Sequence, residues 1–463
     1  MTQDVGGRRR VAGVRLGRGF VRTVSALLWR GVIVAALGAI GITGVPSGAS
    51  AQSLAGADTV YASAPPRLLQ IRTLLADAGR QTSTGSGFLV SADGLAITNY
   101  HVVSDAALEP KTYRLEYTGA DGTQGGVTLL AVDLPNDLAL VRVDKHDAPF
   151  FTFDKAALEG SLPKGERLYS LGNPLDLGFT IIEGTYNGLV EHSYNDHIHF
   201  TGALNPGMSG GPAVNAQGQV VGVNVATRRG GQLISFLVPA RFAAALLIRG
   251  KDIRPEAADL RKDVVAQLAS WRGALYKSLA EEGFHDRVFG SYQAPETHAA
   301  WFECWASTNA SASPKPRASI NSTSCKADAS VYVASDLNTG TVEINHSYAK
   351  SIDLNQFQFA TVLTQLAQPR LTLGGTFRKW YTPQHCHEDF VGIAPPADHP
   401  PLRVLWCAQG YREFDGLYDV AVVAVTQDRA DEALVSRLNL QAIAYDDALR
   451  LGRSFLERLQ VAR

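Results

Sequence analysis

The sequence predicts an all-β domain, followed by a long helix and then a smaller α+β domain. Between Gly85 and Val238, short β-branched runs alternate with Gly, Asp, Asn and Pro turns roughly every ten residues, which is typical of a barrel or sandwich. Apolar residues at helical spacing follow from Leu260, and the rest of the chain mixes strand and helix patterns. The length of 463 residues, at about 100 to 200 per domain, agrees with two or three domains.

Composition and charge exclude several classes of protein. Hydrophobic residues make up 45% and charged residues 19%, which excludes collagen-like, wholly disordered and polytopic membrane proteins. The net charge is −1, but residues 1–51 hold seven arginines and one aspartate, so the remaining residues carry a net −7. A body of that sign has no excess of basic side chains to neutralise phosphates, and we expect no nucleic-acid partner.

The first 51 residues have the three parts of a secretory signal peptide. The seven arginines precede an uncharged, largely apolar run from Gly31 to Val45, and small residues follow up to Ala51, where we expect cleavage. A helix over that run would span about 22 Å, which is less than the ~30 Å hydrocarbon core. The sequence therefore predicts an exported protein, periplasmic or secreted, without a stable membrane span once the leader is cleaved. An uncleaved anchor is the alternative.

Residues 52–82 are predicted as a linker and a lead-in helix, because apolar residues recur at helical spacing between Pro66 and Gly79. The β-rich domain is assigned to residues 83–250, where a strand from Leu95 to Asn99 follows a hairpin turn at Asp93-Gly94. A helical spacer is assigned to residues 251–289. Its apolar positions recur at steps of three or four, with Gly283 as the C-cap, and are Leu260, Val264, Leu268, Trp271, Leu275 and Leu279.

Residues 290–463 are predicted as the α+β domain. The expected elements are a loop over Ser307–Ser324, a hairpin of Ser330–Ala334 with Thr341–Asn345, a helix over Leu354–Leu366, a strand over Tyr418–Thr426, and one or two helices over Ala433–Leu459. The function of this domain does not follow from its sequence.

The C-terminal domain holds all four cysteines of the chain. An exported protein with a small, even number of cysteines usually pairs them. Cys304 and Cys325 lie 21 positions apart, as do Cys386 and Cys407, and we favour these local pairs over the other two connectivities. A zinc site is the rival interpretation, since His385 and His387 flank Cys386, but no Cys-x-x-Cys motif is present.

A glycine-rich segment, Asn205-Pro-Gly207-Met-Ser209-Gly-Gly-Pro212, presents a candidate nucleophile. A serine hydroxyl needs a base within hydrogen-bond reach, and backbone N–H groups aimed at the developing oxyanion increase the rate. The glycines permit a tight turn that could aim the N–H groups of Gly207 and Ser209 at one point. Taken alone, such a segment is equally well a flexible turn.

Two further residues supply a base and a group to orient it. His101 follows the strand that ends at Asn99, and Asp137 follows a Pro-Asn turn. Each alone has a structural explanation, as a satisfied histidine or a turn-capping aspartate. Together, histidine, then aspartate 36 residues on, then serine 72 residues further, follow one of the known chain orders of the Ser-His-Asp triad.

With these motifs, residues from about 83 to 245 resemble a chymotrypsin-fold serine protease, and most closely the bacterial Do-like (high-temperature-requirement) envelope proteases. The matching motifs are Gly85–Phe88, Thr98–Val103, Asp137–Ala139, Leu171–Pro174, Asn205–Pro212 and Ser235–Pro239. The resemblance implies a double β-barrel that hydrolyses peptide bonds without a cofactor. Ser209 is then the nucleophile, His101 the base and Asp137 its orienting group, with the oxyanion held by the Gly207 and Ser209 amides.

The resemblance also implies a specificity pocket lined by Ala203, Val223 and Val225. With no carboxylate there, a small apolar side chain is the expected fit. The expected partners are polypeptides of the cell envelope, and oligomer formation is left open. The chain departs from the family at Met208, where Asn or Asp is usual, and no peptide-binding PDZ module is recognisable after Pro239.

Three alternatives stay open at this point. The protein could be a catalytically silent protease-fold protein that binds or recruits a partner in the cell envelope. The C-terminal domain could be an autoinhibitor or a substrate-recruiting arm. His192, His197 and His199 could hold a metal, with His197 and His199 on one face of a strand, but the third ligand is unaccounted for, and no metal site is predicted.

Overall fold

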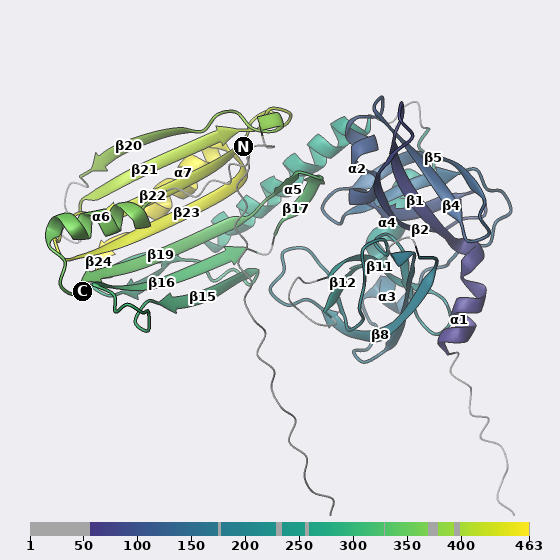
Figure 1. Ribbon diagram of the computed structural model, residues 1–463, viewed down its shortest axis with the longest axis horizontal. Helices are drawn as coiled ribbons and strands as arrows, with labels where there is room; N and C mark the ends of the chain where they lie inside the picture. The colour runs from purple at the N-terminus through teal and green to yellow at the C-terminus, as the bar shows by residue number, and fades with distance from the viewer. Residues whose placement is uncertain are drawn as a thin grey trace, which may run out of the picture. The chain divides into compact units, whose positions relative to one another are not determined.

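Two closed antiparallel barrels of six strands each carry the N-terminal half of the structure (Figure 1). The computed structural model describes residues 56–174, 177–227, 234–254, 259–327, 329–368, 378–392 and 399–462. The predicted signal peptide lies outside these residues. Among the helices within them, none is both long enough and apolar enough to cross a membrane.

The first barrel has the strand order β1-β2-β3-β6-β5-β4 and is preceded by the helix α1 (Ala57–Ser63) and the short 3-10 helix η1 (Pro65–Arg67). Helix α2 (Tyr100–Leu108) follows β3 directly. The strands are β1 (Leu68–Leu75), β2 (Gln81–Leu89), β3 (Leu95–Asn99), β4 (Tyr113–Gly119), β5 (Gln124–Asp133) and β6 (Leu138–Val143).

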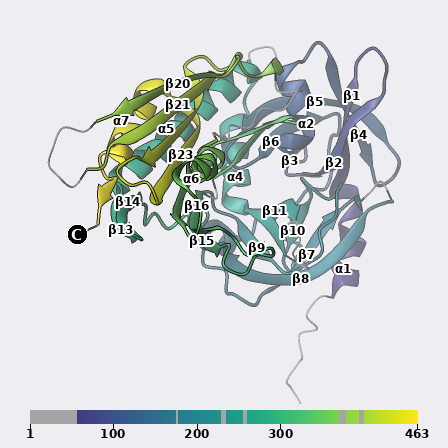
Figure 2. The ribbon, with the colours of Figure 1, turned by 60° about the vertical axis from the view of Figure 1, so that its left-hand side comes forward.

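The second barrel has the order β10-β11-β12-β9-β8-β7 and is flanked by α3 (Lys155–Glu159) and α4 (Ala240–Gly250). Helix α4 packs against β11 and against β5 and β6 of the first barrel. Figure 2 shows α4 next to β11. The strands are β7 (Arg167–Gly172), β8 (Thr180–Leu189), β9 (Ile198–Phe200), β10 (Pro212–Val214), β11 (Val220–Thr227) and β12 (Ser235–Pro239). This is the double barrel that the resemblance predicts.

The lead-in helix predicted between Pro66 and Gly79 is wrong. That segment contains β1, which pairs with β2 and β4, so the first barrel begins inside the predicted linker. Six of its eight residues are buried, on both faces of the strand. A strand buried on both faces loses the alternation of period two, and its apolar run then cannot be told from a helix.

Helix α5 (Leu260–Glu282) confirms the predicted long helix. The Asp259 side chain caps its first turn by accepting a hydrogen bond from the Lys262 N–H. The chain leaves the helix at Gly283, whose φ of 71° favours glycine. The predicted apolar positions from Val264 to Leu279 are its buried face.

A seven-stranded antiparallel sheet with the order β15-β16-β19-β23-β22-β21-β20 makes up most of the C-terminal part. Each of its two edges is a hairpin with a cross-strand disulfide, Cys304–Cys325 and Cys386–Cys407. The sulfur atoms are therefore bonded to each other rather than free to ligate zinc. The strands are β15 (Phe302–Thr308), β16 (Ala318–Ala327), β19 (Val342–Ser351), β20 (His385–Val391), β21 (Leu402–Gly410), β22 (Leu417–Thr426) and β23 (Glu432–Ala444).

Smaller elements complete this part of the chain. They are the sheet of β13 (His285–Phe289), β14 (Tyr292–Glu296) and β24 (Gln460–Val461), the hairpin of β17 (Val331–Ala334) and β18 (Leu337–Thr339), and the helices α6 (Gln356–Leu366) and α7 (Tyr445–Leu456). The predicted helix over Leu354–Leu366 and strand over Tyr418–Thr426 are confirmed by α6 and β22.

Three C-terminal predictions are wrong in part. The helices predicted from Ala433 begin only at Tyr445, because the preceding residues form the central strand β23, which is buried along nearly its whole length. Thr341–Asn345 pairs within the large sheet, and the partner of β17 is β18. Both ends of the predicted loop Ser307–Ser324 are strand, because paired polar residues there share an edge of the sheet, and only residues 309–317 form the loop.

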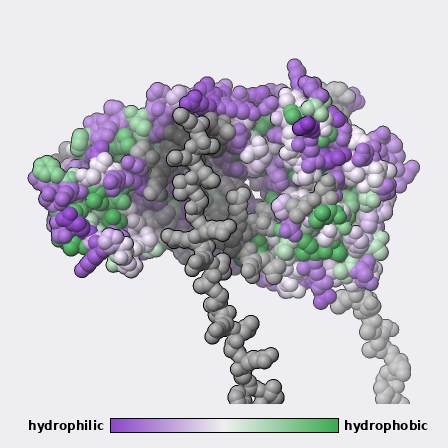
Figure 3. Space-filling model, in the orientation of Figure 1, coloured by the Kyte–Doolittle hydropathy of each residue, from purple (hydrophilic) through white to green (hydrophobic). Residues whose placement is uncertain are grey.

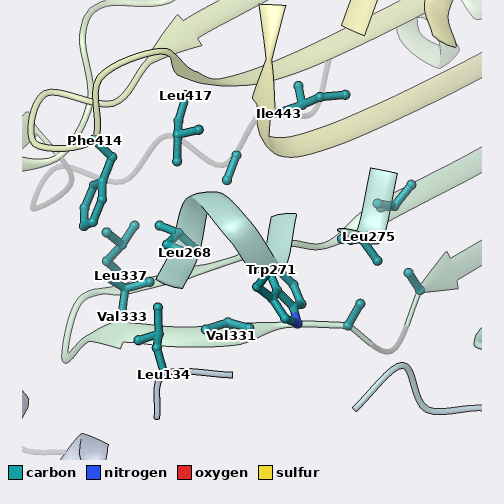
Figure 4. Packing of buried hydrophobic residues seen from close by; sticks show 14 of the residues in the cluster. Leu134, Leu268, Trp271, Leu275, Val331, Val333, Leu337, Phe414, Leu417 and Ile443 are labelled. Atoms are coloured by element: carbon teal, nitrogen blue, oxygen red, sulfur yellow. The ribbon is translucent and has the colours of Figure 1, made fainter. Parts of the chain in front are cut away.

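One apolar core joins the first barrel, α5 and the C-terminal sheet. Leu268, Trp271 and Leu275 on α5 pack in it with residues of β17, β18, β22 and β23 (Figure 4). A second core fills the other barrel and the strands of the first barrel that face it. On the face shown in Figure 3, hydrophobic residues occur in separate groups among hydrophilic ones.

Candidate active site

His101 and Asp137 form a hydrogen-bonded pair at the end of the first barrel. His101 is the second residue of α2, directly after β3, and Asp137 lies in the turn between β5 and β6. The His101 backbone N–H donates to Asp137 Oδ1 at 2.8 Å, and its ring Nδ1 lies 2.6 Å from Oδ2. Because Nδ1 faces the carboxylate, Nε2 is the ring nitrogen left to exchange a proton with another group.

The backbone at Asp137 is what turns its carboxylate toward the histidine. Its φ is 51°, in the left-handed region, which aspartate tolerates better than most residues. The Asp137 carbonyl accepts hydrogen bonds from the Asn99 side chain at 2.8 Å and from the Tyr100 N–H at 3.1 Å. The two segments are thus tied together by backbone and side-chain bonds on both sides of the pair.

Asp137 also controls the charge of His101. Burial of the imidazole opposes its protonation, but the negative charge of Asp137 and its hydrogen bond outweigh that effect and raise the pKa of His101 above 6.5. The side chains of His101 and Asp137 keep 28% and 17% of their surface exposed, so a ligand can reach them.

The loop that carries Ser209, residues 205–211 (the serine loop), packs directly against β3, the strand that leads to His101. Gly210 has a φ of 85°, and a Cβ added there would lie 2.8 Å from the Asn99 nitrogen. Ser86 fixes the same loop from β2, because its N–H donates to the Ser209 carbonyl at 2.7 Å and its hydroxyl donates to the Gly207 carbonyl at 2.7 Å. The Ser209 backbone is therefore held next to the start of α2.

The backbone donors of this loop divide into two groups. The N–H groups of Met208, Gly210 and Gly211 donate to the carbonyls of Asn205, Asn224 and Met208. Within the described part of the chain, those of Gly207 and Ser209 donate to no protein acceptor. Two backbone N–H groups left free beside a serine hydroxyl, here those of Gly207 and of Ser209 itself, are the arrangement that stabilises an oxyanion.

The Ser209 hydroxyl does not bond to His101 in this structure. Its Oγ donates to the Val225 carbonyl at 3.3 Å, and no other hydrogen bond of this side chain is present among the described residues. In ligand-free sites such bonds are often long and tighten only when substrate is bound. The structure thus brings the His101–Asp137 pair and the serine loop together without closing the hydrogen bond between them.

A cavity of about 320 Å³ opens beside His101 and Asp137, with Val225 in its lining. Of the other predicted pocket residues, Ala203 is exposed and is not part of this lining. Val223 corrects the prediction, because it is fully buried in the core of the second barrel and cannot contact a substrate. Met208 is likewise buried in that core, where an ion pair would lack solvation.

Sequence reasoning missed Tyr332, on β17. Its ring lies edge-on to the His101 ring, with centroids 5.8 Å apart, and its residue lines the cavity. No motif in the sequence connects a residue 123 positions after Ser209 with His101, because the contact depends on how the C-terminal part packs.

The three histidines of the metal alternative do not form a ligand set among the described residues. His192 contacts the Ala300 carbonyl through Nδ1 at 2.7 Å, and the His197 ring lies near Phe236. His199 is on β9.

Comparison with known proteins places part of the chain in a family. Residues 85–223 match the family described as "Trypsin-like peptidase domain". A DegP-like periplasmic serine endoprotease from Chlamydia muridarum is 34% identical over 176 residues, covering 36% of this chain and 34% of the relative. One from Hahella chejuensis is 32% identical over 207 residues, covering 43% and 40%. The chain thus spans less than half the length of these relatives.

Among solved structures, the serine endoprotease from Yersinia pestis is 22% identical with a TM-score of 0.36, covering 42% of this chain and 65% of the other. A protease from Mycobacterium tuberculosis in its active form is 23% identical with a TM-score of 0.37, covering 42% and 86%. On the family match and the two closed barrels, residues 85–223 are a trypsin-like peptidase domain of the chymotrypsin fold, related to the Do-like serine proteases.

Proposed function

We propose that this protein is an exported serine endopeptidase that acts on polypeptides of the cell envelope. The observation that carries the proposal is the His101–Asp137 pair beside a serine loop in which, among the described residues, the N–H groups of Gly207 and Ser209 donate to no protein acceptor. A scaffold that merely binds peptides has no physical need for this combination.

The residues act in two steps. Ser209 Oγ bonds to the scissile carbonyl carbon while His101 Nε2 takes the hydroxyl proton, and the Gly207 and Ser209 amides hold the oxyanion. His101 then gives that proton to the leaving amine, which leaves an acyl-enzyme. Water hydrolyses the acyl-enzyme in the reverse sense, with His101 again accepting and returning a proton. Asp137 keeps the imidazole oriented and stabilises its charged form.

A small apolar residue before the cleaved bond is the proposed preference. No carboxylate stands at Ala203 or Val225, the two predicted pocket residues that are not fully buried. A lysine or arginine side chain would therefore lose water without gaining a counter-charge.

Export is supported by independent features. The leader has the pattern of a signal peptide, and the two disulfides agree with an oxidising compartment. The curated relatives described above are named as periplasmic.

Hydrolysis of a fluorogenic peptide panel tests the proposal. Peptides cleaved after Val, Ile or Ala should have a higher kcat/KM than one cleaved after Lys, and Ser209→Ala should abolish turnover. Ser161→Ala, an exposed serine of the same barrel, is the matched control and should match the unaltered protein. Equal binding of the peptides by the unaltered protein and Ser209→Ala, with no turnover by either, would instead support a binding protein.

A further inference from the structure

The β17–β18 hairpin of the C-terminal part lies against the candidate base. Besides the ring contact with His101, the Tyr332 hydroxyl lies 3.4 Å from Ser104 Oγ on α2. The neighbouring Tyr100 hydroxyl donates to the Val333 carbonyl at 2.9 Å, in a buried position. Two tyrosines, one from each side, therefore join the hairpin to the helix that carries His101.

The same hairpin closes one side of the cavity beside His101. The cavity lining combines Leu134 and Pro135 of the first barrel with Val190, Val225 and Phe236 of the second. Ser330, Val331 and Tyr332 supply the third side. A volume of about 320 Å³ is near the lower end of the range for ligand sites, roughly 300 to 1,000 Å³, and suits one bulky side chain.

The hairpin is anchored too firmly for a detachable flap. Val331, Val333 and Leu337 are buried in the core shared with α5. At its turn, Asp336 accepts a hydrogen bond from the Trp380 indole at 2.6 Å. Flaps that open readily have few buried apolar contacts, so this hairpin is better described as a fixed wall of the cavity.

The loop on the opposite side, residues 190–197, is also held by the C-terminal part. The Trp271 indole of α5 donates to Asn195 Oδ1 at 3.1 Å, and His192 contacts the Ala300 carbonyl. The Tyr194 ring packs edge-on against Trp271 and Trp301, with centroids 5.8 and 5.2 Å apart. Both walls of the cavity thus depend on residues outside the barrels.

We infer that this cavity receives an apolar side chain of the polypeptide substrate, and that Tyr332 is a specificity-determining residue for it. The inference rests on the proposed function. The cavity contacts His101 and Val225 but not Ala203, so its occupant belongs to a residue next to the one cleaved. Apolar groups make up the larger share of its lining, and its polar residues include His101, Asp137, Ser193, Asn195, His197 and Ser330. The Asp137 carboxylate is already bonded to His101, so an apolar occupant fits better than a charged one.

Substitution of Tyr332 in both directions tests this role. Tyr332→Ala enlarges the cavity, so the kcat/KM ratio of peptides with Phe to those with Ala at the neighbouring position should rise about tenfold. Tyr332→Trp reduces the cavity, and the ratio should fall. Tyr332→Phe keeps the ring and should keep the ratio. Phe357→Ala removes an exposed aromatic side chain of α6 and is the control with unchanged ratio and activity. Thermal unfolding identifies any variant that fails to fold.

A change that is the same for every peptide would overturn the inference, and a general rise in activity would make Tyr332 an obstruction instead. A binding measurement separates this inference from the proposed function. Fluorescence anisotropy gives the affinity of the same peptides for Ser209→Ala and for Ser209→Ala/Tyr332→Ala. If the ratio of affinities for the Phe and Ala peptides shifts but the unaltered protein shows no turnover, Tyr332 determines specificity and the protein is not a peptidase. If the unaltered protein turns the peptides over but the ratio of affinities is unchanged, the protein is a peptidase and Tyr332 does not determine its specificity.

Discussion

At the level of single residues, backbone conformation decides which side chains meet. Asp137 reaches the His101 ring because its left-handed backbone turns the carboxylate back toward α2. That conformation places one oxygen on the His101 N–H and the other on Nδ1. The pair is therefore set in orientation before any substrate binds, which is the role that an orienting carboxylate must have.

Asp137→Asn should change both the rate and its pH dependence. Neutral His101 is the form that accepts the serine proton, so kcat/KM should fall as the pH drops through the pKa of His101, which lies above 6.5. In the variant, burial still lowers this pKa and the charge that raises it is gone, so the acid limb should move to lower pH. The value of kcat should fall by about 10⁴-fold. Asp144→Asn, at an exposed aspartate, is the control.

The measurement is kcat/KM from pH 5 to pH 9 for both variants and the unaltered protein. An acid limb that stays in place in Asp137→Asn would contradict the assignment of that limb to His101.

The three candidate catalytic residues could be found from sequence because their types, order and local turns are specific together. Val223 and Tyr332 could not. Val223 and Val225 stand two apart on β11, which predicts one shared face, but the pairing of β11 with β12 shifts register between Asn224 and Ala226. Such an irregularity breaks the alternation, and it falls at Val225, which lines the cavity, whereas Val223 stays buried in the core. Tyr332 reaches His101 only through tertiary packing.

At the level of elements, the serine loop depends on glycine where it contacts the first barrel. Gly210 combines a positive φ with close approach to Asn99 and to the Ser86 carbonyl. The Asn224 side chain braces the loop from β11, because its amide donates to the carbonyls of Leu171 and Met208 at 3.0 and 3.2 Å. Loop and strand ends thus fix the position of Ser209 relative to α2.

Gly210→Ala should reduce kcat/KM by about 100-fold or more, because moving the loop away from β3 displaces Ser209 and the oxyanion donors. Gly218→Ala is the matched control, since Gly218 also has a positive φ (74°) but no atom within 4 Å of an added Cβ. Peptide hydrolysis and thermal unfolding of both variants check this. Equal activity of the two variants would mean that the close approach to Asn99 is unimportant.

The two strands that sequence reasoning took for helices share one physical cause. Strands β1 and β23 are buried on both faces, and even polar residues such as Thr73 and Ser436 are buried, so burial does not follow the pattern of apolar and polar residues. The one-sided pattern of α5, by contrast, was readable because its polar face meets water while its apolar face meets the core. Burial on both sides is set by the tertiary arrangement, which a local pattern does not contain.

At the level of the whole molecule, α5 packs its apolar face in a core shared with the first barrel and the C-terminal sheet. The same apolar cluster contains β-barrel residues such as Ile71, helix residues such as Leu268, and sheet residues such as Leu417. The described residues from Gly56 to Ala462 belong to one compact unit. The barrel with His101 and the C-terminal sheet should therefore unfold together.

Leu268→Ala should destabilise the entire structure by about 2 to 5 kcal/mol, because it leaves a cavity at a fully buried position between barrel and sheet. Ile248→Ala, at a position on α4 that is 71% exposed, should change the free energy of unfolding by less than about 0.5 kcal/mol. Urea unfolding followed by tryptophan fluorescence and by loss of activity is the measurement. The two probes should report one coincident transition, and separate midpoints would contradict a shared core.

Covalent labelling of the mature protein with a fluorophosphonate tests the central claim most directly. The account predicts one adduct per chain, located on Ser209 by peptide mass analysis, absent in Ser209→Ala and strongly slowed in His101→Ala. A folded protein that takes up no label, or that is labelled equally after Ser209→Ala, would contradict the claim that His101, Asp137 and Ser209 make a working nucleophile.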